Sequence, residues 1–234
     1  KPGQSRIDLA QTNADIIKAI TPDIVRHAPD AIYVFVSNPV DILTYEFIKL
    51  SGIPENRVLG SGTLLDTVRL RSRLAEYMQV SQKNVHAYVL GEHGDSSFVP
   101  WSIAEISSVP LTEYKERLIH KTSIMPELDL PEIEKYIRSS GGKIIQRKGA
   151  TYYAIAISVC HIVKVLFGGV DAVLTVSTMM HGEYGIEGVC LSIPTLVGPN
   201  GIAGKVLPKL TAEEEEKLRH SADVLKGVIA KLEM

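Results

Sequence analysis

One short apolar run constrains the fold of this chain most strongly. Residues 30–39, DAIYVFVSNP, hold a continuous stretch of apolar side chains that ends abruptly in Ser-Asn-Pro. A run without polar alternation is typical of a strand buried on both faces, and such strands belong to parallel sheets covered by helices. The sequence therefore predicts an α/β fold in which this segment is an interior strand.

The neighbouring segments predict a doubly wound sheet. Residues 7–29 have helical apolar spacing, and residues 40–52 (VDILTYEFIKLSG) predict a helix that ends at Gly52. A second short strand is expected in RVLGSG (57–62), followed by a helix that Thr63 opens. The order helix, strand, helix, strand, helix is that of a doubly wound parallel sheet.

The character of the chain changes in its second part. Residues 99–111 indicate strands, and residues 130–169 indicate long helices. Short strands separated by turns such as Pro199-Asn200-Gly201 are expected over residues 172–202. Residues 211–232 predict an amphipathic helix with an acidic first turn. This mixture predicts a separate α+β domain.

Composition excludes several classes of partner. The 234 residues carry a formal charge of −2, which gives no electrostatic reason to expect nucleic acid or an anionic membrane. No run of apolar residues is long enough to span a bilayer. Cys160 and Cys190 stand in apolar runs without a CxxC or metal-ligand spacing. We interpret both as reduced core residues of a cytoplasmic protein.

The segment GEHGD (91–95) sets His93 among acids and glycines after an apolar run that we expect to be a buried strand. A metal site would need further ligands at HxxxH or HxH spacing, and a nucleophile would need an elbow such as GxSxG. Neither pattern occurs, so general acid–base chemistry is favoured over a hydrogen-bonded core histidine. Neighbours on an extended segment point to opposite faces, so Glu92 should not reach the ring.

Other polar residues stand where ligands bind. Asn38 ends a predicted strand, a ligand-binding position in open α/β sheets, although Asn-Pro is also a common turn. Asp66 and Arg69 share one helix face, whereas Arg71 lies about 200° around from Arg69. Asp66 also fits a capping box with Thr63, and a solvated helix arginine is the alternative for Arg69.

The segments SNPVDIL, GSGTLLDTVRLR, NVHAYVLGEHGDSS and KGATYY occur in this order. Together they resemble the bacterial L-lactate dehydrogenase branch of the lactate/malate dehydrogenase family, along nearly the whole chain. The resemblance implies the C-terminal part of an NAD-binding Rossmann domain over residues 1–62 and an α+β catalytic domain over residues 63–234. It also implies reversible hydride transfer between NADH and pyruvate.

The resemblance implies roles for the residues that carry the chemistry. His93 matches the family's acid–base histidine, and Asp66 matches the carboxylate that holds and charges the imidazole. Arg69 matches the arginine that binds the substrate carboxylate, for which a planar guanidinium is suited. Arg6 matches an arginine on a mobile loop, KPGQSR, that polarises the reacting carbonyl and closes over the substrate.

The resemblance also implies the residues that line the site. Asn38 matches an asparagine beside the substrate and the nicotinamide, and Thr151 matches a hydroxyl on the substrate side. Val36, Ser37 and Ser61 match contacts to the NAD cofactor, as does Asn38. No metal is implied.

Arg71 and His86 match positions at which many bacterial members bind fructose 1,6-bisphosphate between subunits. On an extended strand His86 and His93 point to opposite faces, so His86 should leave the active site. We therefore hypothesise allosteric activation by this sugar phosphate in a homotetramer, and two exposed basic residues without an effector are the alternative. The resemblance implies a cytoplasmic enzyme of glycolysis and fermentation.

KGATYY and NVHAY favour lactate over malate, and the rival is a malate or other 2-hydroxyacid dehydrogenase with the same machinery. A non-catalytic protein that reuses the fold is disfavoured because every catalytic position is filled. The residue that best separates lactate from malate enzymes is expected immediately before Lys1. We also expect the GxGxxG fingerprint before Lys1, within about 60 or more further residues.

Overall fold

The computed structural model describes residues 6–119 and 126–232, with the backbone alone for residues 6–9. The helices are α1 (Arg6–His27), α2 (Val40–Ser51), α3 (Leu64–Met78), α4 (Tyr114–Arg117), α5 (Leu130–Lys148), α6 (Tyr153–Phe167) and α7 (Ala212–Ile229). The strands are β1 (Tyr33–Phe35), β2 (Val58–Gly60), β3 (Val85–His86), β4 (Glu105–Ile106), β5 (Val109–Pro110), β6 (Ala172–His181), β7 (Glu187–Gly198) and β8 (Gly201–Lys205). Short 3-10 turns are η1 (Glu55–Arg57), η2 (Gln82–Asn84), η3 (Trp101–Ile103) and η4 (Glu183–Gly185).

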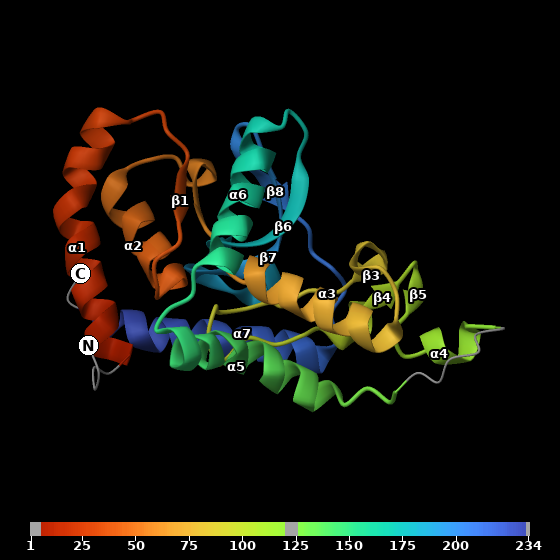
Figure 1. Ribbon diagram of the computed structural model, residues 1–234. Coiled ribbons are helices and arrows are strands. Elements are labelled where there is room, and N and C mark those ends of the chain that lie inside the picture. Colours follow the sequence, from red (N-terminus) through yellow and green to blue (C-terminus); the bar gives the residue numbers. More distant parts are fainter. Residues whose placement is uncertain (1–5, 120–125, 233–234) are drawn as a thin grey trace.

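A five-stranded sheet in the order β1-β2-β6-β7-β8 organises the molecule. β1 and β2 are parallel, as predicted, and the β2–β6, β6–β7 and β7–β8 pairs are antiparallel. Figure 1 shows α1 and α2 side by side at one end of the sheet, and α3, α5 and α7 in the lower part of the view. The predicted fold class, part of a parallel Rossmann sheet followed by an α+β region, is confirmed.

β1 differs from the expectation of a strand buried on both faces. Its three residues are only half-buried, because it pairs with β2 and forms the edge of the sheet in the described part of the chain. The predicted apolar run is longer than the strand, and Val36 after it is exposed. α2 ends at Gly52 as predicted, with the left-handed φ of 67° that glycine adopts without steric cost.

The second part of the chain pairs more regularly than expected. β6 and β7 are long strands where short ones were predicted, and the turn at Pro199-Asn200-Gly201 joins β7 to β8 as predicted. The apolar run before His93 is regular strand only at Val85–His86, so the prediction of one continuous strand is wrong. β3, β4 and β5 form a second, antiparallel sheet.

The two cysteines differ in burial. Cys190 is buried in β7, as predicted, but Cys160 is exposed on α6. The prediction for Cys160 is wrong because α6 is apolar on most of its surface and only part of it packs against the sheet. Its large side chains Tyr153, Ile157 and Phe167 are 78%, 71% and 86% exposed.

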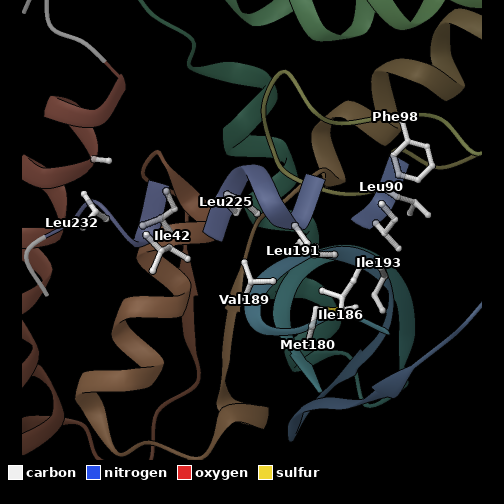
Figure 2. Packing of buried hydrophobic residues seen from close by; sticks show 14 of the residues in the cluster. Ile42, Leu90, Phe98, Met180, Ile186, Val189, Leu191, Ile193, Leu225 and Leu232 are labelled. Atoms are coloured by element: carbon white, nitrogen blue, oxygen red, sulfur yellow. The ribbon is translucent and has the colours of Figure 1, made fainter. Parts of the chain in front are cut away.

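One core cluster holds the segment that carries His93 against the rest of the molecule. Leu90 and Phe98, which precede and follow that segment, pack with Leu191 of β7 and Leu225 of α7 (Figure 2). Burying one side chain of this size stabilises the fold by about 1.5–3 kcal/mol. The cluster therefore fixes α7, β7 and the His93 segment relative to one another.

None of the helices in the described residues combines the length and the apolar character that crossing a bilayer requires.

Candidate active site

The carboxylate of Asp66, in the first turn of α3, contacts both His93 and Arg69. Its Oδ2 lies 2.6 Å from His93 Nδ1, and its Oδ1 accepts a hydrogen bond of 3.1 Å from Arg69 Nη1. The side chains of Asp66 and Arg69 are only 10% and 16% exposed, so the ion pair is partly shielded from water. The structure thus brings together three residues that the sequence placed on two separate segments.

Thr63 precedes α3 as predicted, but the alternative interpretation of Asp66, as part of a capping box with Thr63, does not hold. Thr63 makes no side-chain cap hydrogen bond, and its hydroxyl instead donates to the carbonyl oxygen of Val89 over 2.5 Å. Asp66 is thereby available to His93 and Arg69. Thr63 ties α3 to the segment that leads into His93.

His93 stands in a turn with a rigid base. Leu90 and Phe98 exchange backbone hydrogen bonds, and so do Gly91 and Ser192 of β7. Gly91 has a φ of 91°, which favours glycine. The amide of His93 donates to Oδ2 of the buried Asp41 over 2.8 Å. The histidine is therefore fixed by its backbone as well as by its ring.

Glu92, the sequence neighbour of His93, folds back on its own turn. Its carboxylate accepts a short hydrogen bond from the Ser96 hydroxyl, and its backbone amide donates to Ser221 of α7 over 2.8 Å. The expectation that Glu92 does not partner the His93 ring agrees with this geometry. Asp66, not a sequence neighbour, is the partner.

Burial and charge act in opposite directions on the His93 imidazole. Burial lowers its pKa, but the hydrogen bond and charge of Asp66, helped by the charge of Asp41, outweigh burial and raise the pKa above 6.5. The charge of Arg69 opposes this rise. Burial also raises the pKa of Asp41 to about 6. A protonated imidazole therefore persists at neutral pH better than on a free histidine.

The predicted cofactor contacts lie at the carboxyl end of β1. Val36, Ser37 and Asn38 are exposed there, and the Asn38–Pro39 peptide bond is cis. Ser61 follows the parallel strand β2, is buried, and donates its amide to the carbonyl of Phe35 over 2.7 Å. An apolar side chain beside exposed hydroxyl and amide groups at the carboxyl ends of two parallel strands fits a nicotinamide dinucleotide.

Two other predicted site residues are less well placed. Thr151 is half-buried in the connection between α5 and α6, and among the described residues no hydrogen bond or ion pair joins it to Asp66, Arg69 or His93. Arg6 begins α1, but its side chain lies outside the described residues, as do residues 1–5. Both assignments stay predictions.

The two predicted effector residues both lie at the segment 86–88: His86 belongs to the segment and Arg71 is bound to it. Arg71 Nε donates to the carbonyl of Ala87 over 2.9 Å, and its guanidinium lies over the Tyr88 ring at 4.9 Å. His86, next to Ala87, is exposed. Arg71 is thus held against the segment 86–88, while Arg69 is held by Asp66.

Asp41 and Ser221, which contact the His93 turn, were missed by the sequence analysis. A carboxylate among the apolar residues VDIL, one turn after a strand end, is a signal that could have drawn attention to Asp41. Ser221 lies on the apolar face that Leu218 and Leu225 define, where a serine is also unexpected. Their partners are remote in sequence, so the contacts themselves require the fold.

In the described ranges, no group of three or more histidine, cysteine, aspartate or glutamate side chains is arranged to hold a metal ion.

Comparison with known families decides the assignment. Residues 1–60 match the model for the lactate/malate dehydrogenase NAD binding domain, and residues 63–234 match the model for the lactate/malate dehydrogenase alpha/beta C-terminal domain. The chain belongs to the lactate/malate dehydrogenase family. It is an NAD-dependent oxidoreductase with the two-part organisation of that family.

Individual relatives of this lactate/malate dehydrogenase agree. The L-lactate dehydrogenase of Acetivibrio thermocellus is 42% identical over 234 residues, which cover 100% of this chain and 73% of that protein. The L-lactate dehydrogenase of Bacillus pumilus is 43% identical over 230 residues, covering 98% of this chain and 72% of that protein.

Solved structures of family members share the fold. The structure of L-lactate dehydrogenase from Clostridium thermocellum superposes with a TM-score of 0.89 at 40% identity, over 98% of this chain and 74% of that one. A minor L-lactate dehydrogenase from Enterococcus mundtii, in a ligand-bound form, gives 0.91 at 39% identity, over 100% of this chain and 73% of that one.

Proposed function

We propose that this protein is an L-lactate dehydrogenase that reversibly reduces pyruvate to L-lactate with NADH. The observation that carries the proposal is the shared carboxylate of Asp66, 2.6 Å from His93 Nδ1 and 3.1 Å from Arg69 Nη1. The arrangement puts a proton donor beside a carboxylate-binding group, which is what a 2-oxoacid needs. The names of the relatives support the same activity.

His93 is the proposed acid–base residue. Because Nδ1 faces Asp66, the other ring nitrogen, Nε2, is the atom that donates a proton to the ketone oxygen during reduction and accepts it during lactate oxidation. Asp66 fixes the ring orientation and stabilises the imidazolium. Without this donor an alkoxide would form in a partly dry site, which is costly.

Arg69 is the proposed clamp for the substrate carboxylate. A guanidinium has several N–H donors in a rigid plane, and the described bond to Asp66 uses one of them. The remaining donors can bind a carboxylate with two parallel hydrogen bonds. Arg6 is proposed to polarise the ketone, and Thr151 to contact the substrate.

Val36, Ser37, Asn38 and Ser61 are the proposed contacts to the cofactor. NAD supplies or takes up the hydride when it is bound. Asn38 can both donate and accept a hydrogen bond, and Val36 offers an apolar surface at 36% exposure. Since Asp41 is in the first turn of the helix that follows Asn38 and binds the His93 amide, cofactor and proton donor are held through one connected segment.

Activation by fructose 1,6-bisphosphate in a homotetramer is part of the proposal. Arg71 points to a different side of α3 from Arg69 and is bound to Ala87, the sequence neighbour of the exposed His86, which supports a phosphate site near the segment 86–88. The exposed apolar side chains of α6, among them Tyr153, Ile157 and Phe167, support an assembled state that covers them.

Steady-state rates with pyruvate, oxaloacetate and 2-oxoisocaproate on the full-length protein test the proposal. We expect the highest kcat/KM with pyruvate. A preference for oxaloacetate would replace the proposed activity with malate dehydrogenase activity, and a preference for the branched oxoacid with another 2-hydroxyacid dehydrogenase activity. No turnover with any of the three would favour a non-catalytic role.

A further inference from the structure

Two consecutive backbone amides at the proposed acid–base residue are held by side chains from two different helices. The amide of His93 donates to Asp41 of α2 over 2.8 Å. The amide of Glu92, one residue earlier, donates to the hydroxyl oxygen of Ser221 of α7 over 2.8 Å. The C-terminal helix therefore reaches the His93 turn directly, through one serine.

The bond from Ser221 is part of a closed ring of hydrogen bonds. The Ser221 and Ser96 hydroxyl oxygens lie 3.0 Å apart, and the Ser96 hydroxyl donates to the Glu92 carboxylate. An ionised carboxylate only accepts, so the hydrogen of Ser96 is committed to Glu92 and that of Ser221 must point to Ser96. The ring runs from the Glu92 amide through Ser221 and Ser96 back to the Glu92 side chain, with every hydrogen assigned.

The packing around Ser221 is tight. Ser221 is 0% exposed, and a Cβ built on Gly91 would come within 2.6 Å of its Oγ. The half-buried Glu92 carboxylate also packs closely on its own turn, because a Cβ on Gly94 would meet it at 2.5 Å. The close packing at Gly91 and Gly94 therefore restricts where the chain enters His93.

We propose that Ser221 is a positioning residue for the acid–base reaction, acting through the Glu92 amide on the alignment of His93 with Asp66. The effect on turnover rests on the proposed function; the effect on the imidazole does not. Removing the hydroxyl leaves the Glu92 amide without its acceptor and opens the ring at two bonds. The turn then relaxes, and the 2.6 Å contact between His93 and Asp66 is strained or lengthened.

The test compares Ser221→Ala with a matched control. Ser102→Ala also removes a hydroxyl that bonds α7, since Ser102 donates to Glu214 over 2.5 Å, but it does not touch the His93 turn. For each variant of the full-length protein we would measure the His93 titration by NMR, assigned with His93→Gln, together with kcat and KM for pyruvate and the melting temperature.

We expect Ser221→Ala to lower the pKa of His93 by about half a unit, because the raised value depends on Asp66. We expect kcat to fall about tenfold, while KM changes little because Arg69 is not displaced. Ser102→Ala should lower the melting temperature and leave both the His93 titration and kcat unchanged. Ser96→Ala, which opens the ring but keeps the Glu92–Ser221 bond, should give a smaller shift in the same direction.

An unchanged His93 titration in Ser221→Ala would overturn the proposal, even with a lower melting temperature, since Ser221 would then be only structural. If Ser221→Ala does not fold, Ser221→Cys decides instead, because its thiol is a weak acceptor of similar shape and should show the same lowered pKa. A wild-type protein that reduces no pyruvate would count against the proposed function alone, because the titration needs no substrate.

Discussion

Asp66 has two carboxylate oxygens, and each is bound to a different residue of the proposed site. One contacts His93 and the other Arg69, so a single buried side chain orients both the proton donor and the carboxylate clamp. At the residue scale, changes at Asp66 should therefore affect protonation, while changes at Arg69 should affect substrate binding.

Asp66→Asn tests the protonation. The uncharged amide cannot stabilise the imidazolium, so we expect the pKa of His93 to fall and kcat/KM for pyruvate to drop by about a hundredfold or more. Reduction needs the protonated ring, so the rate of pyruvate reduction falls as pH rises through the pKa of His93. In Asp66→Asn this falling limb of the pH–rate profile should move to lower pH. Asp30→Asn, at a carboxylate that is 92% exposed and paired with Arg57, is the control. A limb that does not move would contradict the assignment of Asp66.

Arg69→Lys tests the clamp. Lysine keeps the charge but loses the planar fork, so we expect KM for pyruvate to rise roughly 10–100-fold, with a smaller effect on kcat. Arg73→Lys, on the same helix and paired with Glu76, should leave KM unchanged. Equal KM values in the two variants, measured from initial rates, would rule out substrate binding by Arg69.

At the element scale, side-chain hydrogen bonds attach the N-terminus of α7 to the body of the molecule. Its N-terminus has a capping box between Thr211 and Glu214, and Glu214 also accepts hydrogen bonds from the amide and hydroxyl of Ser102. Burial raises the pKa of Glu214, but these hydrogen bonds outweigh burial and hold the pKa below 4.5. The carboxylate form is therefore the one that stabilises the fold.

Glu214→Gln should lower the unfolding free energy by about 1–3 kcal/mol at neutral pH, because the ionised acceptor is lost. A depressed pKa contributes stability above the unfolded value of 4.5, and this contribution is lost as pH falls through the folded value. The difference in unfolding free energy between wild type and Glu214→Gln, measured by urea unfolding, should therefore close below pH 4.5. Glu213→Gln, at an exposed neighbour, is the control; a gap that persists in acid would contradict the account.

Several elements could be predicted from sequence because local rules determine them. Gly52 ends α2, and the periodicity of residues 211–232 gives α7. The start of α3 at Thr63 was also predicted correctly, but the partner of the Thr63 hydroxyl was not, because its contact with Val89 exists only in the folded chain. The same reason explains why the ring of Glu92, Ser96 and Ser221 was not foreseen.

At the scale of the whole molecule, the β6–β8 strands continue the sheet that β1 and β2 begin. The predicted division between residues 1–62 and 63–234 stays a prediction, because β2 and β6 pair across it at Gly60 and Ser177. The meeting of Asp66, Arg69 and His93 could be predicted from the family resemblance, whereas the half-buried β1 could not, since its exposure depends on which strands flank it.

Activation by an effector is a prediction at this scale. We expect millimolar fructose 1,6-bisphosphate to lower the pyruvate KM and to raise the tetramer fraction of the full-length protein, because the effector favours an assembled active state. Arg71→Gln should remove both effects and leave the unactivated rate in place. Steady-state kinetics and sedimentation with and without the sugar phosphate check this prediction. It would be contradicted if the pyruvate KM and the tetramer fraction both stayed unchanged.

The single most direct measurement is the pyruvate reduction rate of His93→Asn in the full-length protein. The account predicts a loss of at least about a thousandfold, with an unchanged circular dichroism spectrum, because the amide of asparagine cannot act as a general acid near neutral pH. A folded His93→Asn protein that keeps its rate within about tenfold would contradict the central claim that His93, oriented by Asp66, transfers the proton.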